Sequence, residues 1–451
     1  MKKYIEKILA ILARRIIKKY QPKIIGVSGS LGKTSTVNAL YAVLSYEYNV
    51  RQNIKNYNNE LGLPLTVINA ESGGKSLFQW VGVFLKAFKL LIITDKKYPE
   101  MLILEMGIDI KGDLDYLINI AQPDIGVLTS VSETHLEPTN PKAIGKPDLW
   151  LKNIEGVFKE KQKIITRLKE DGIAILNHDD QLVVSLRDKL NQKVFTYGFE
   201  SESMVKAGEI LFAGLEIDFC KSDANFDCKV WGINFKVSYN GSTVPVFLPH
   251  CFGNHHVYSA LAAISAGISQ GMNLVDIAEG LRKYRPAPGR MNIVAGIKYS
   301  LIIDDTYNSP AARAVITGLE LLSQLKLDKV NKKIAVLGDM LELGQKSEEA
   351  HREVGLKITE LEIDYLITVG NSMKLTASSA VEAGFSKENV KSFSDQEKAG
   401  RFLQDLIIKG DIIFVKGSQR MRMEKIVKEI MAEPDQAKNL LVRQSADWLK
   451  K

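Results

Sequence analysis

The stretch GVSGSLGKTSTVNAL, residues 26–40, contains the residue types of a phosphate-binding loop. Glycines let a backbone turn tightly, so that successive N–H groups point at phosphate oxygens. Lys33 offers a positive charge to the β- and γ-phosphates, and Thr34 or Ser35 offers a hydroxyl to Mg²⁺. The stretch therefore predicts nucleotide binding, through Gly29, Ser30, Gly32, Lys33, Thr34 and Ser35.

The glycine spacing departs from the strict pattern GxxxxGK[ST], which requires a glycine at position 27. Val27 stands there, and Gly26 provides the glycine one residue earlier. We expect Gly26, Gly29 and Gly32 together to allow the turn. The context supports the loop, because an apolar run precedes it and a segment with helical periodicity follows it.

Two other polar stretches are candidates for contact with a substrate. Asn56, Asn58 and Asn59 fall within four residues. Asparagine tolerates left-handed backbone and caps helices, so one interpretation is a structural turn. The other interpretation is a loop that contacts the substrate. Lys416 and Ser418 follow an apolar run, in a loop suited to a carboxylate or a phosphate.

A mainly parallel sheet is expected to position the first of these residues. Apolar runs of strand length at 23–29, 101–107 and 123–131 alternate with helical segments, as in α/β folds. Residues 192–250 alternate like antiparallel strands, and a helical pattern returns at 253–270. We therefore predict a P-loop-type, mainly parallel sheet with a small antiparallel portion.

A second α/β domain is expected beyond the prolines and glycine of 285–292. There, apolar runs end in polar or glycine residues and are followed by helical patterns, which is typical of a Rossmann-like fold. Such sheets place ligands at the carboxyl ends of their strands. We predict a basic amphipathic helix at 1–20, a central ATP-binding domain at 21–285 and a Rossmann-like domain at 286–451.

Positive charge is concentrated at the N-terminus. The chain of 451 residues has a formal charge of +7, and residues 1–20 hold seven Lys or Arg against Glu6. The nearly neutral remainder argues against a nucleic-acid-binding surface. Two interpretations of the first segment stay open: a helix docked on its own domain, or a helix on an anionic membrane surface. Its apolar face would consist of Ile5, Ile8, Leu9, Leu12 and Ile16.

A second apolar stretch spans 77–93 and contains Lys86 and Lys89. It is short for a membrane-spanning helix, which needs roughly 20 apolar residues. We predict an amphipathic helix that faces the core or a partner, with membrane contact as the alternative.

The three cysteines, Cys220, Cys228 and Cys251, lack the CxxC spacing of a zinc ribbon and form no disulfide framework. Hydrophobic residues make up 45% of the chain and charged residues 25%, as in soluble globular proteins. We therefore expect buried free thiols in a reducing compartment, the cytoplasm.

In order along the chain, a series of segments resembles the Mur ligase superfamily. The displaced glycine of the phosphate loop is the first resemblance, and the order and spacing hold from about residue 21 to the end. DDTYNSP resembles the branch that ligates D-alanyl-D-alanine, whereas relatives more often carry a DYAH-like sequence there. The other segments are KNYNNELGLPLT (55–66), LEMGID (104–109), VLTSVSETHLE (127–137), GNHHVYSALAA (253–263), GRM (289–291), DDTYNSP (304–310), LGDMLELG (337–344) and KGSxxxxME (416–424).

The resemblance implies an ATP-dependent amide ligase of peptidoglycan precursor synthesis. ATP would convert the carboxylate of a muramoyl-tripeptide to an acyl phosphate, which the amine of D-Ala-D-Ala would attack. ATP and two Mg²⁺ ions are the implied cofactors. Two alternatives stay open: a ligase of the superfamily with a different acceptor, of pseudomurein or polyglutamate type, and a non-catalytic nucleotide-binding scaffold.

The resemblance also implies roles for individual residues. Thr34 and Glu105 would hold the Mg²⁺ that accompanies ATP, and Glu105 and His135 would hold a second one. Lys161 would be a carbamylated lysine that serves as an anionic metal ligand, and a solvated lysine is the alternative. With Lys33, these residues form the implied catalytic set.

Further implied contacts lie in the second half of the chain. His256 stands where the family has an asparagine that grips the base. Arg290 resembles an arginine that reaches the nucleotide, and Asp305 is placed for the ribose with Asn308 nearby. The region of Lys416 lies near the incoming dipeptide in the family.

Members of this family typically begin with a separate domain that holds the UDP-sugar end of the acceptor. The phosphate loop starts at residue 26, and we expect the residues before it to be too few for such a domain. Recognition of UDP would then come from a partner or from 77–93, or the acceptor would be lipid-linked. A lipid-linked acceptor would fit peripheral contact with the inner face of the membrane through 1–20 or 77–93.

Overall fold

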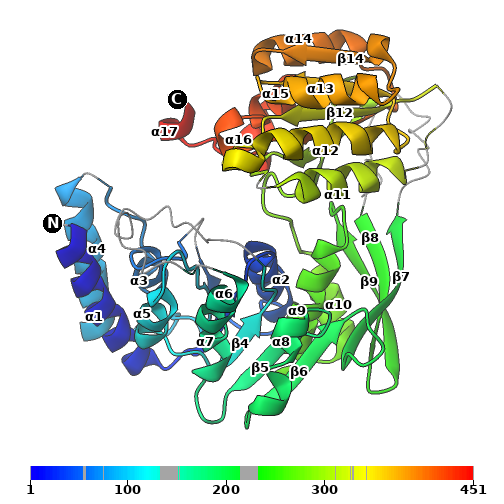
Figure 1. Cartoon of the computed structure of the whole chain (residues 1–451). Coiled ribbons are helices and arrows are strands. Elements are labelled where there is room, and N and C mark those ends of the chain that lie inside the picture. The colour runs from blue at the N-terminus through cyan, green and yellow to red at the C-terminus, as the bar shows by residue number, and fades with distance from the viewer. Residues whose placement is uncertain are drawn as a thin grey trace, which may run out of the picture. The chain divides into compact units, whose positions relative to one another are not determined.

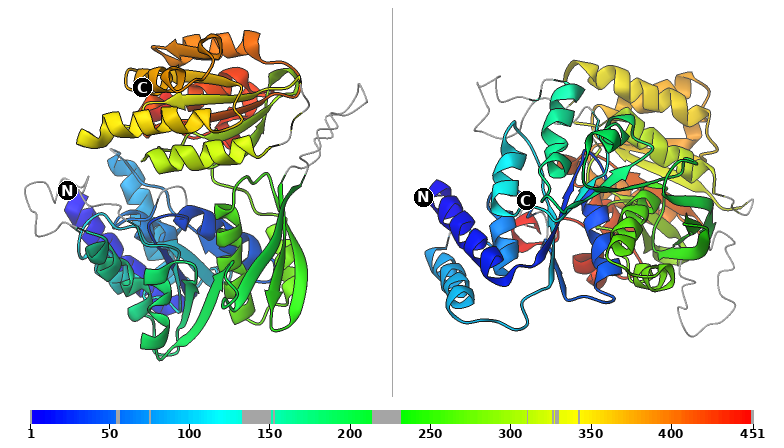
Figure 2. Two further views of the ribbon diagram at one scale, coloured as in Figure 1. Left: turned by 45° about the vertical axis from the view of Figure 1, so that its right-hand side comes forward. Right: turned by 90° about the horizontal axis from the view of Figure 1, so that it is seen from below.

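A computed structural model describes residues 2–53, 57–74, 76–132, 151, 153–213, 232–309, 311–325, 327, 330–341 and 343–449 of the chain. The chain divides into two compact units (Figure 1; Figure 2). Unit 1 comprises Met1–Leu211, Asn234–Leu248 and Asn254–Arg285, and unit 2 comprises Phe212–Ile233, Pro249–Gly253 and Pro286–Lys451.

A nine-stranded sheet forms the centre of unit 1, in the order β2-β3-β1-β4-β5-β6-β7-β8-β9. The strands from β2 to β7 in this order pair in parallel. Asn240–Gly241, with φ of 46° and 78°, is the two-residue turn that joins β8 to β9 in a hairpin. The predicted mainly parallel sheet with an antiparallel portion is confirmed. The strands are β1 (Lys23–Ser28), β2 (Val50–Gln52), β3 (Met101–Glu105), β4 (Ile125–Leu128), β5 (Ile173–Asn177), β6 (Lys193–Gly198), β7 (Val205–Ala213), β8 (Gly232–Tyr239) and β9 (Ser242–Pro249).

Helices cover both faces of this sheet (Figure 1). α2, α9 and α10 pack together on one face, and α3 and α7 lie against the other, with α5 next to α7. α1 packs on α3, α4 and α5 at the outer side of this second layer. The helices are α1 (Lys2–Tyr20), α2 (Lys33–Leu44), α3 (Gly62–Ile68), α4 (Leu77–Ile92), α5 (Asp113–Ile120), α6 (Ile154–Lys161), α7 (Lys163–Thr166), α8 (Gln181–Val184), α9 (His255–Ser269) and α10 (Leu274–Leu281).

The N-terminal helix α1 is docked on its own unit. Leu9, Leu12 and Ile16 are buried as predicted, and Ile5 is partly buried. Ile8, also on the predicted apolar face, is 46% exposed, so this part of the face is not covered by unit 1. The stripe of α1 that packs on α3, α4 and α5 is therefore narrower than the whole predicted apolar face. Ile8, the residue before Leu9, points to the side of that stripe.

The stretch 77–93 forms helix α4, as predicted. It packs on unit 1 through Trp80, Val83, Ala87 and Leu90, which recur every three or four residues. Across the described residues, none of the helices has the length and hydropathy that crossing a membrane requires.

Unit 2 contains a six-stranded sheet in the order β10-β11-β15-β12-β13-β14. β10 is antiparallel to β11 and the other pairs are parallel, which confirms the Rossmann-like expectation. β15 lies between β11 and β12, and its register places Lys416 beside Asp305. The strands are β10 (Asn292–Ala295), β11 (Leu301–Asp305), β12 (Lys333–Gly338), β13 (Tyr365–Val369), β14 (Val390–Phe393) and β15 (Ile412–Lys416).

Two hydrophobic clusters hold the helices of unit 2 to the two faces of this sheet. α11, α12 and α13 contribute to one cluster, and α14 and α15 contribute to the other. The helices are α11 (Ala312–Ser323), α12 (Ser347–Thr359), α13 (Met373–Glu382), α14 (Gln396–Leu406), α15 (Glu424–Ile430), α16 (Ala437–Leu440) and α17 (Ala446–Leu449).

Candidate active site

The phosphate loop leaves the central strand β1 and enters α2, and two glycines shape it. Gly29 has φ of 149° and Gly32 has φ of 80°, which side chains disfavour. A Cβ on Gly29 would lie 2.0 Å from Thr129 Oγ1. Gly26 does not belong to the turn, and this expectation is wrong. It lies within β1, where a Cβ would crowd the side chains of Ile164 at 2.7 Å and of Pro123 at 2.8 Å.

The end of β4 holds the loop in place. Ser30 N donates to Ser130 O at 2.8 Å, and Ser132 N donates to Ser30 Oγ at 2.9 Å. Thr129 Oγ1 donates to Leu31 O at 2.6 Å. Much of the loop's shape is therefore set before any ligand arrives.

The ammonium group of Lys33 folds back over the loop. Its Nζ donates to Gly29 O at 2.8 Å and to Ser30 O at 3.2 Å. A positive charge thus sits at the N-terminal end of α2, which favours an anion.

The side chains of Thr34 and Glu105 are in direct contact, as two ligands of one Mg²⁺ would have to be. Thr34 Oγ1 donates to Glu105 Oε2 at 2.9 Å, and Asn58 Nδ2 donates to Glu105 Oε1 at 3.0 Å. The register of β1 with β3 places Val27 beside Glu105, which brings this buried carboxylate to the loop. Of the two candidate hydroxyls, Thr34 takes this place, because Ser35 is buried in α2.

Sequence reasoning missed Asn53, whose Oδ1 accepts a hydrogen bond from Glu105 N. Asn53 directly follows β2, the strand beside β3. The carboxyl ends of parallel strands lie at one edge of a sheet. The position of Asn53 after a strand could therefore have indicated from the sequence that it lies near Glu105.

Lys161 ends α6 and reaches the same loop. Its side chain is 1% exposed, and its Nζ donates to Gly29 O at 2.9 Å. Burial and the neighbouring charge of Lys33 lower the pKa of Lys161 to about 6, against a partial opposing effect of Glu160. The solvated-lysine interpretation is therefore wrong.

Glu160, which was not predicted, anchors the end of α6. Its Oε1 accepts hydrogen bonds from Gly112 N at 3.0 Å and Leu114 N at 3.2 Å. Lys163 pairs with Glu160 Oε2 at 2.5 Å and with Asp115 at 2.8 Å. Glu160 is buried in this ion-pair network and Lys163 is partly buried, whereas Lys159 is exposed.

The remaining predicted residues of unit 1 divide three ways. Asn56 and His135 lie outside the described residues. Asn59 Oδ1 accepts a hydrogen bond from Gly62 N at 3.0 Å, which matches the turn interpretation. His256 is fully buried, and its Nδ1 lies 2.8 Å from Tyr284 Oη. This geometry gives His256 a packing role and leaves its ring no surface for a base.

No group of three His, Cys, Asp or Glu side chains with metal-binding geometry occurs in the part of the chain that the structure describes. The polar groups that lie at the phosphate loop are instead the hydroxyl of Thr34, the carboxylate of Glu105 and the buried amine of Lys161.

A second group of predicted residues lies at the carboxyl edge of the sheet in unit 2. Lys416 Nζ pairs with Asp305 Oδ2 at 2.5 Å and donates to Asn308 O at 3.0 Å. Burial raises the pKa of Asp305, and the charges of Lys416 and Arg290 oppose that rise. Ser418 Oγ donates to Ser309 O at 3.1 Å. The structure thus brings four of the predicted residues close to one loop.

Arg290 lies over the ring of Tyr307, with its Cζ 4.0 Å from the ring centre. This cation–π contact positions the arginine beside the same loop.

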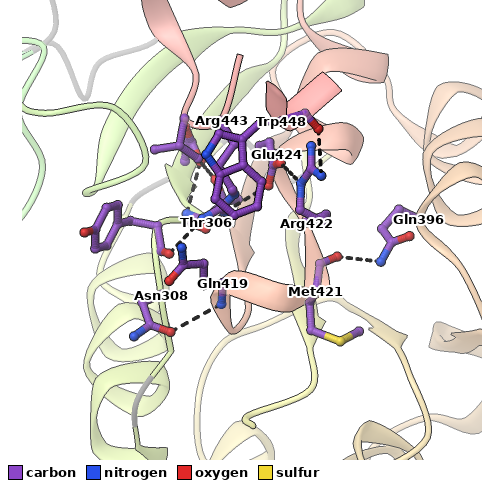
Figure 3. A network of polar contacts seen from close by, with 12 residues as sticks. Thr306, Asn308, Gln396, Gln419, Met421, Arg422, Glu424, Arg443 and Trp448 are labelled. Atoms are coloured by element: carbon purple, nitrogen blue, oxygen red, sulfur yellow. Dashed lines mark hydrogen bonds and ion pairs between the residues drawn. The ribbon is translucent and has the colours of Figure 1, made fainter. Parts of the chain in front are cut away.

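The C-terminal segment contacts this loop through Arg443 (Figure 3). Arg443 donates to the backbone oxygens of Thr306 and Tyr307, and pairs with Glu424 at 2.9 Å. Glu424 is 1% exposed and also pairs with Arg422. Sequence reasoning missed Arg443, because it lies beyond every segment that carried the resemblance.

Comparisons with known proteins agree with this arrangement. Residues 85–267 match the Mur ligase middle domain, and residues 289–419 match the Mur ligase glutamate ligase domain. The UDP-N-acetylmuramoyl-tripeptide–D-alanyl-D-alanine ligase of Bacillus subtilis (strain 168) is 29% identical over 425 residues, covering 94% of this chain and 79% of its own length.

Solved structures share the fold. MurF from Acinetobacter baumannii superposes with a TM-score of 0.73 at 24% identity, covering 95% of this chain and 81% of its own. The MurF ligase from Thermotoga maritima, in complex with ADP, superposes with a TM-score of 0.69 at 25% identity, covering 94% and 83%.

Proposed function

Because the chain belongs to the Mur ligase family, we propose that it is an ATP-dependent ligase that joins D-alanyl-D-alanine to a muramoyl-tripeptide precursor of peptidoglycan. One observation carries the proposal. Lys33, the Thr34–Glu105 pair and Lys161 converge on a single phosphate loop, in a chain of which 94% aligns with a ligase of that activity.

The chemistry requires activation of a carboxylate, which is a poor electrophile. A carboxylate oxygen attacks the γ-phosphorus of ATP, ADP leaves, and an acyl phosphate forms. The amine nitrogen of the dipeptide then attacks the acyl carbon, phosphate leaves, and the amine loses a proton. Lys33, whose Nζ lies at the phosphate loop, would stabilise negative charge on the phosphoryl oxygens during the first step.

The oxygen atoms of Thr34 and Glu105 at the loop fit Mg²⁺, which prefers hard oxygen ligands. Thr34 and Glu105 would hold the ion that accompanies ATP, and Glu105 with His135 would hold a second one. An ion held there would neutralise part of the charge on the phosphates.

We extend the proposal to carbamylation of Lys161. Its lowered pKa supports a neutral amine at physiological pH. That amine would attack the carbon of CO₂ and release a proton, so that a buried lysine becomes an anion beside the loop. The bond between Lys161 Nζ and Gly29 O supports the required position.

The predicted residues of unit 2 serve the same reaction in this proposal. Arg290, Asp305 and Asn308 are assigned to the nucleotide, and Lys416 and Ser418 to the carboxylate of the incoming dipeptide. The network that joins Asp305, Asn308 and Lys416 supports their acting together.

We place the reaction in the cytoplasm, where ATP and nucleotide-linked precursors are available. The carrier of the acceptor, UDP or a lipid, is left to experiment, and so is a partner protein that recognises UDP.

The test is phosphate release in a substrate panel with ATP and Mg²⁺. We expect release only when D-Ala-D-Ala is present together with a UDP-linked or lipid-linked muramoyl-tripeptide. Turnover with D-Glu or L-amino acids instead would favour a different ligase of the family. Nucleotide binding without turnover on any acceptor, with or without cell extract, would favour a scaffold. Lys33→Ala should abolish release, and full activity in that variant would refute the role of the loop.

A further inference from the structure

Helix α4 is apolar on two opposite faces. One face packs on unit 1, as described above. The other face carries side chains at intervals of three and four residues, so they form one continuous stripe. The stripe, here called the α4 outer face, consists of Phe78 (91% exposed), Val81 (48%), Leu85 (64%), Phe88 (50%) and Ile92 (80%).

Other exposed apolar side chains lie on the same two packed helices. Leu77 and Ile93 are exposed at the two ends of α4, and Tyr4, Ile8 and Ile11 are exposed on α1. Both views in Figure 2 show α1 and α4 side by side. Clusters of exposed apolar side chains on this scale mark interaction sites more often than chance exposure.

Hydrogen bonds from α1 anchor the C-terminal end of α4 to unit 1. Lys19 Nζ donates to Leu90 O at 2.9 Å and to Leu91 O at 3.0 Å, which caps the last turn of α4. The Tyr20 ring stacks on Tyr98 at 4.1 Å. The outer face is therefore presented in one orientation.

Basic residues are frequent in the two helices that carry these exposed apolar side chains. Residues 77–93 contain Lys86 and Lys89 and no acidic residue, and residues 1–20 contain seven Lys or Arg and one Glu. Lys7, Arg14, Arg15 and Lys18 are exposed on α1. Arg14 and Lys18 also line a hollow of about 530 Å³, together with Arg167 and Lys169.

We propose that the α4 outer face, with the basic side of α1, docks the enzyme peripherally on an anionic lipid bilayer. Apolar side chains would enter the boundary between headgroups and acyl chains while the cations meet lipid phosphates. The charge argues for this occupant over a second copy of the chain, because two copies would bring like charges together. The proposal does not depend on which acceptor the enzyme uses.

The experiment is co-sedimentation of the full chain with vesicles. We expect binding to vesicles that contain phosphatidylglycerol, weak binding to pure phosphatidylcholine, and a loss of binding as salt rises. Binding of equal strength to both vesicle types would overturn the electrostatic half of the proposal.

Paired variants test the surface itself. Leu85→Gln/Phe88→Gln should weaken binding to anionic vesicles by about tenfold or more, since two apolar side chains no longer enter the bilayer. Arg15→Gln/Lys18→Gln should weaken it by about fivefold for each charge removed. The matched control, Val275→Gln/Leu356→Gln, changes exposed apolar residues of α10 and α12 and should bind as the wild type does.

Two outcomes would refute the proposal. One is unchanged sedimentation of Leu85→Gln/Phe88→Gln, checked for folding by circular dichroism. The other is a wild type that light scattering shows to be a dimer and that this variant converts to a monomer, because the face would then belong to a second copy. Activity on a soluble acceptor should be unchanged in Arg15→Gln/Lys18→Gln and in Val275→Gln/Leu356→Gln, which separates this test from that of the proposed function.

Discussion

At Lys161 the ammonium form is disfavoured twice, by burial and by the charge of Lys33, and its pKa falls to about 6. Only the neutral amine reacts with CO₂, so the side chain becomes reactive above that pH. An exposed lysine would remain protonated until the pH approached 10.4.

We therefore predict a carbamate on Lys161 whose population rises as the pH increases through about 6. The measurement is ¹³C NMR of the protein in labelled bicarbonate. Lys161→Ala should remove the signal, and Lys159→Ala, which changes an exposed lysine of the same helix, should retain it. A signal that survives Lys161→Ala would contradict the assignment.

Asp304 is a second buried group with a displaced pKa. Its Oδ1 accepts hydrogen bonds from Thr306 N and Oγ1, whereas its Oδ2 is buried with no hydrogen-bond partner among the described residues. Burial raises the pKa of Asp304 to about 7, against the opposing effect of the bonds from Thr306. The folded state therefore binds this proton more tightly than the unfolded state does.

The contribution of Asp304 to the unfolding free energy should fall as the pH rises from about 4 to 7 and then stay level. Asp304→Asn, which imitates the protonated acid, should be more stable than the wild type at pH 8 by about 1–3 kcal/mol. The difference should vanish near pH 4. Urea unfolding of unit 2 measures both, with the exposed Asp435→Asn as the control. Equal stability at pH 8 would contradict the raised pKa.

At the scale of elements, glycines in the central strands determine how closely helix α7 approaches the sheet. A Cβ on Gly126 of β4 would lie 2.5 Å from the backbone oxygen of Ile164. A backbone atom in a packed helix cannot move aside as a side-chain end can. At Gly26 of β1 the nearest atoms belong to the side chains of Ile164 and Pro123, which can shift more readily than backbone.

Gly126→Ala should lower the unfolding free energy of unit 1 by about 1–3 kcal/mol, the usual cost of overpacking a core. The matched control is Gly82→Ala in α4, where an added Cβ meets nothing within 4 Å. That control should raise stability by about 0.5–1 kcal/mol, because alanine favours a helix over glycine. Chemical denaturation measures both. Equal effects of the two substitutions would show that α7 does not restrict Gly126.

At the scale of the molecule, each unit forms its candidate site from segments far apart in the chain. In unit 2, Arg443 comes from the C-terminal segment and Glu424 from α15, and together they hold the loop after β11 (Figure 3). Removing one partner of a buried ion pair leaves the other charge without compensation.

Arg443→Ala should lower the unfolding free energy of unit 2 by about 2–4 kcal/mol, less than for an isolated pair because Arg422 still contacts Glu424. Calorimetry should show a lower melting temperature for this variant. Arg401→Ala breaks an exposed pair with Glu397 and should change stability by less than about 1 kcal/mol. If both variants melt alike, the buried network does not stabilise the loop.

Much of the fold and part of the site follow from the sequence. The sheet order could not be read from it, yet the strand and helix periodicities predicted both α/β units. The loop glycines at 29 and 32 and the Thr34–Glu105 pair were also found there, since they occupy short segments with recognisable spacing. Asn53 was missed although it directly follows strand β2. Glu160 was missed because it acts on a loop distant in the chain, and Arg443 because it lies beyond the segments that carried the resemblance.

The sequence by itself determined the local chemistry: a phosphate loop, the strands that end beside it and two amphipathic helices. Only the tertiary structure decided which side chains are buried. Burial turned Lys161 from one lysine in a charged run into an amine with a lowered pKa, and it gave His256 a packing role. It also left the outer face of α4 exposed. The reason is physical: periodicity shows that a helix has an apolar face, but the neighbours that cover that face come from elsewhere in the chain.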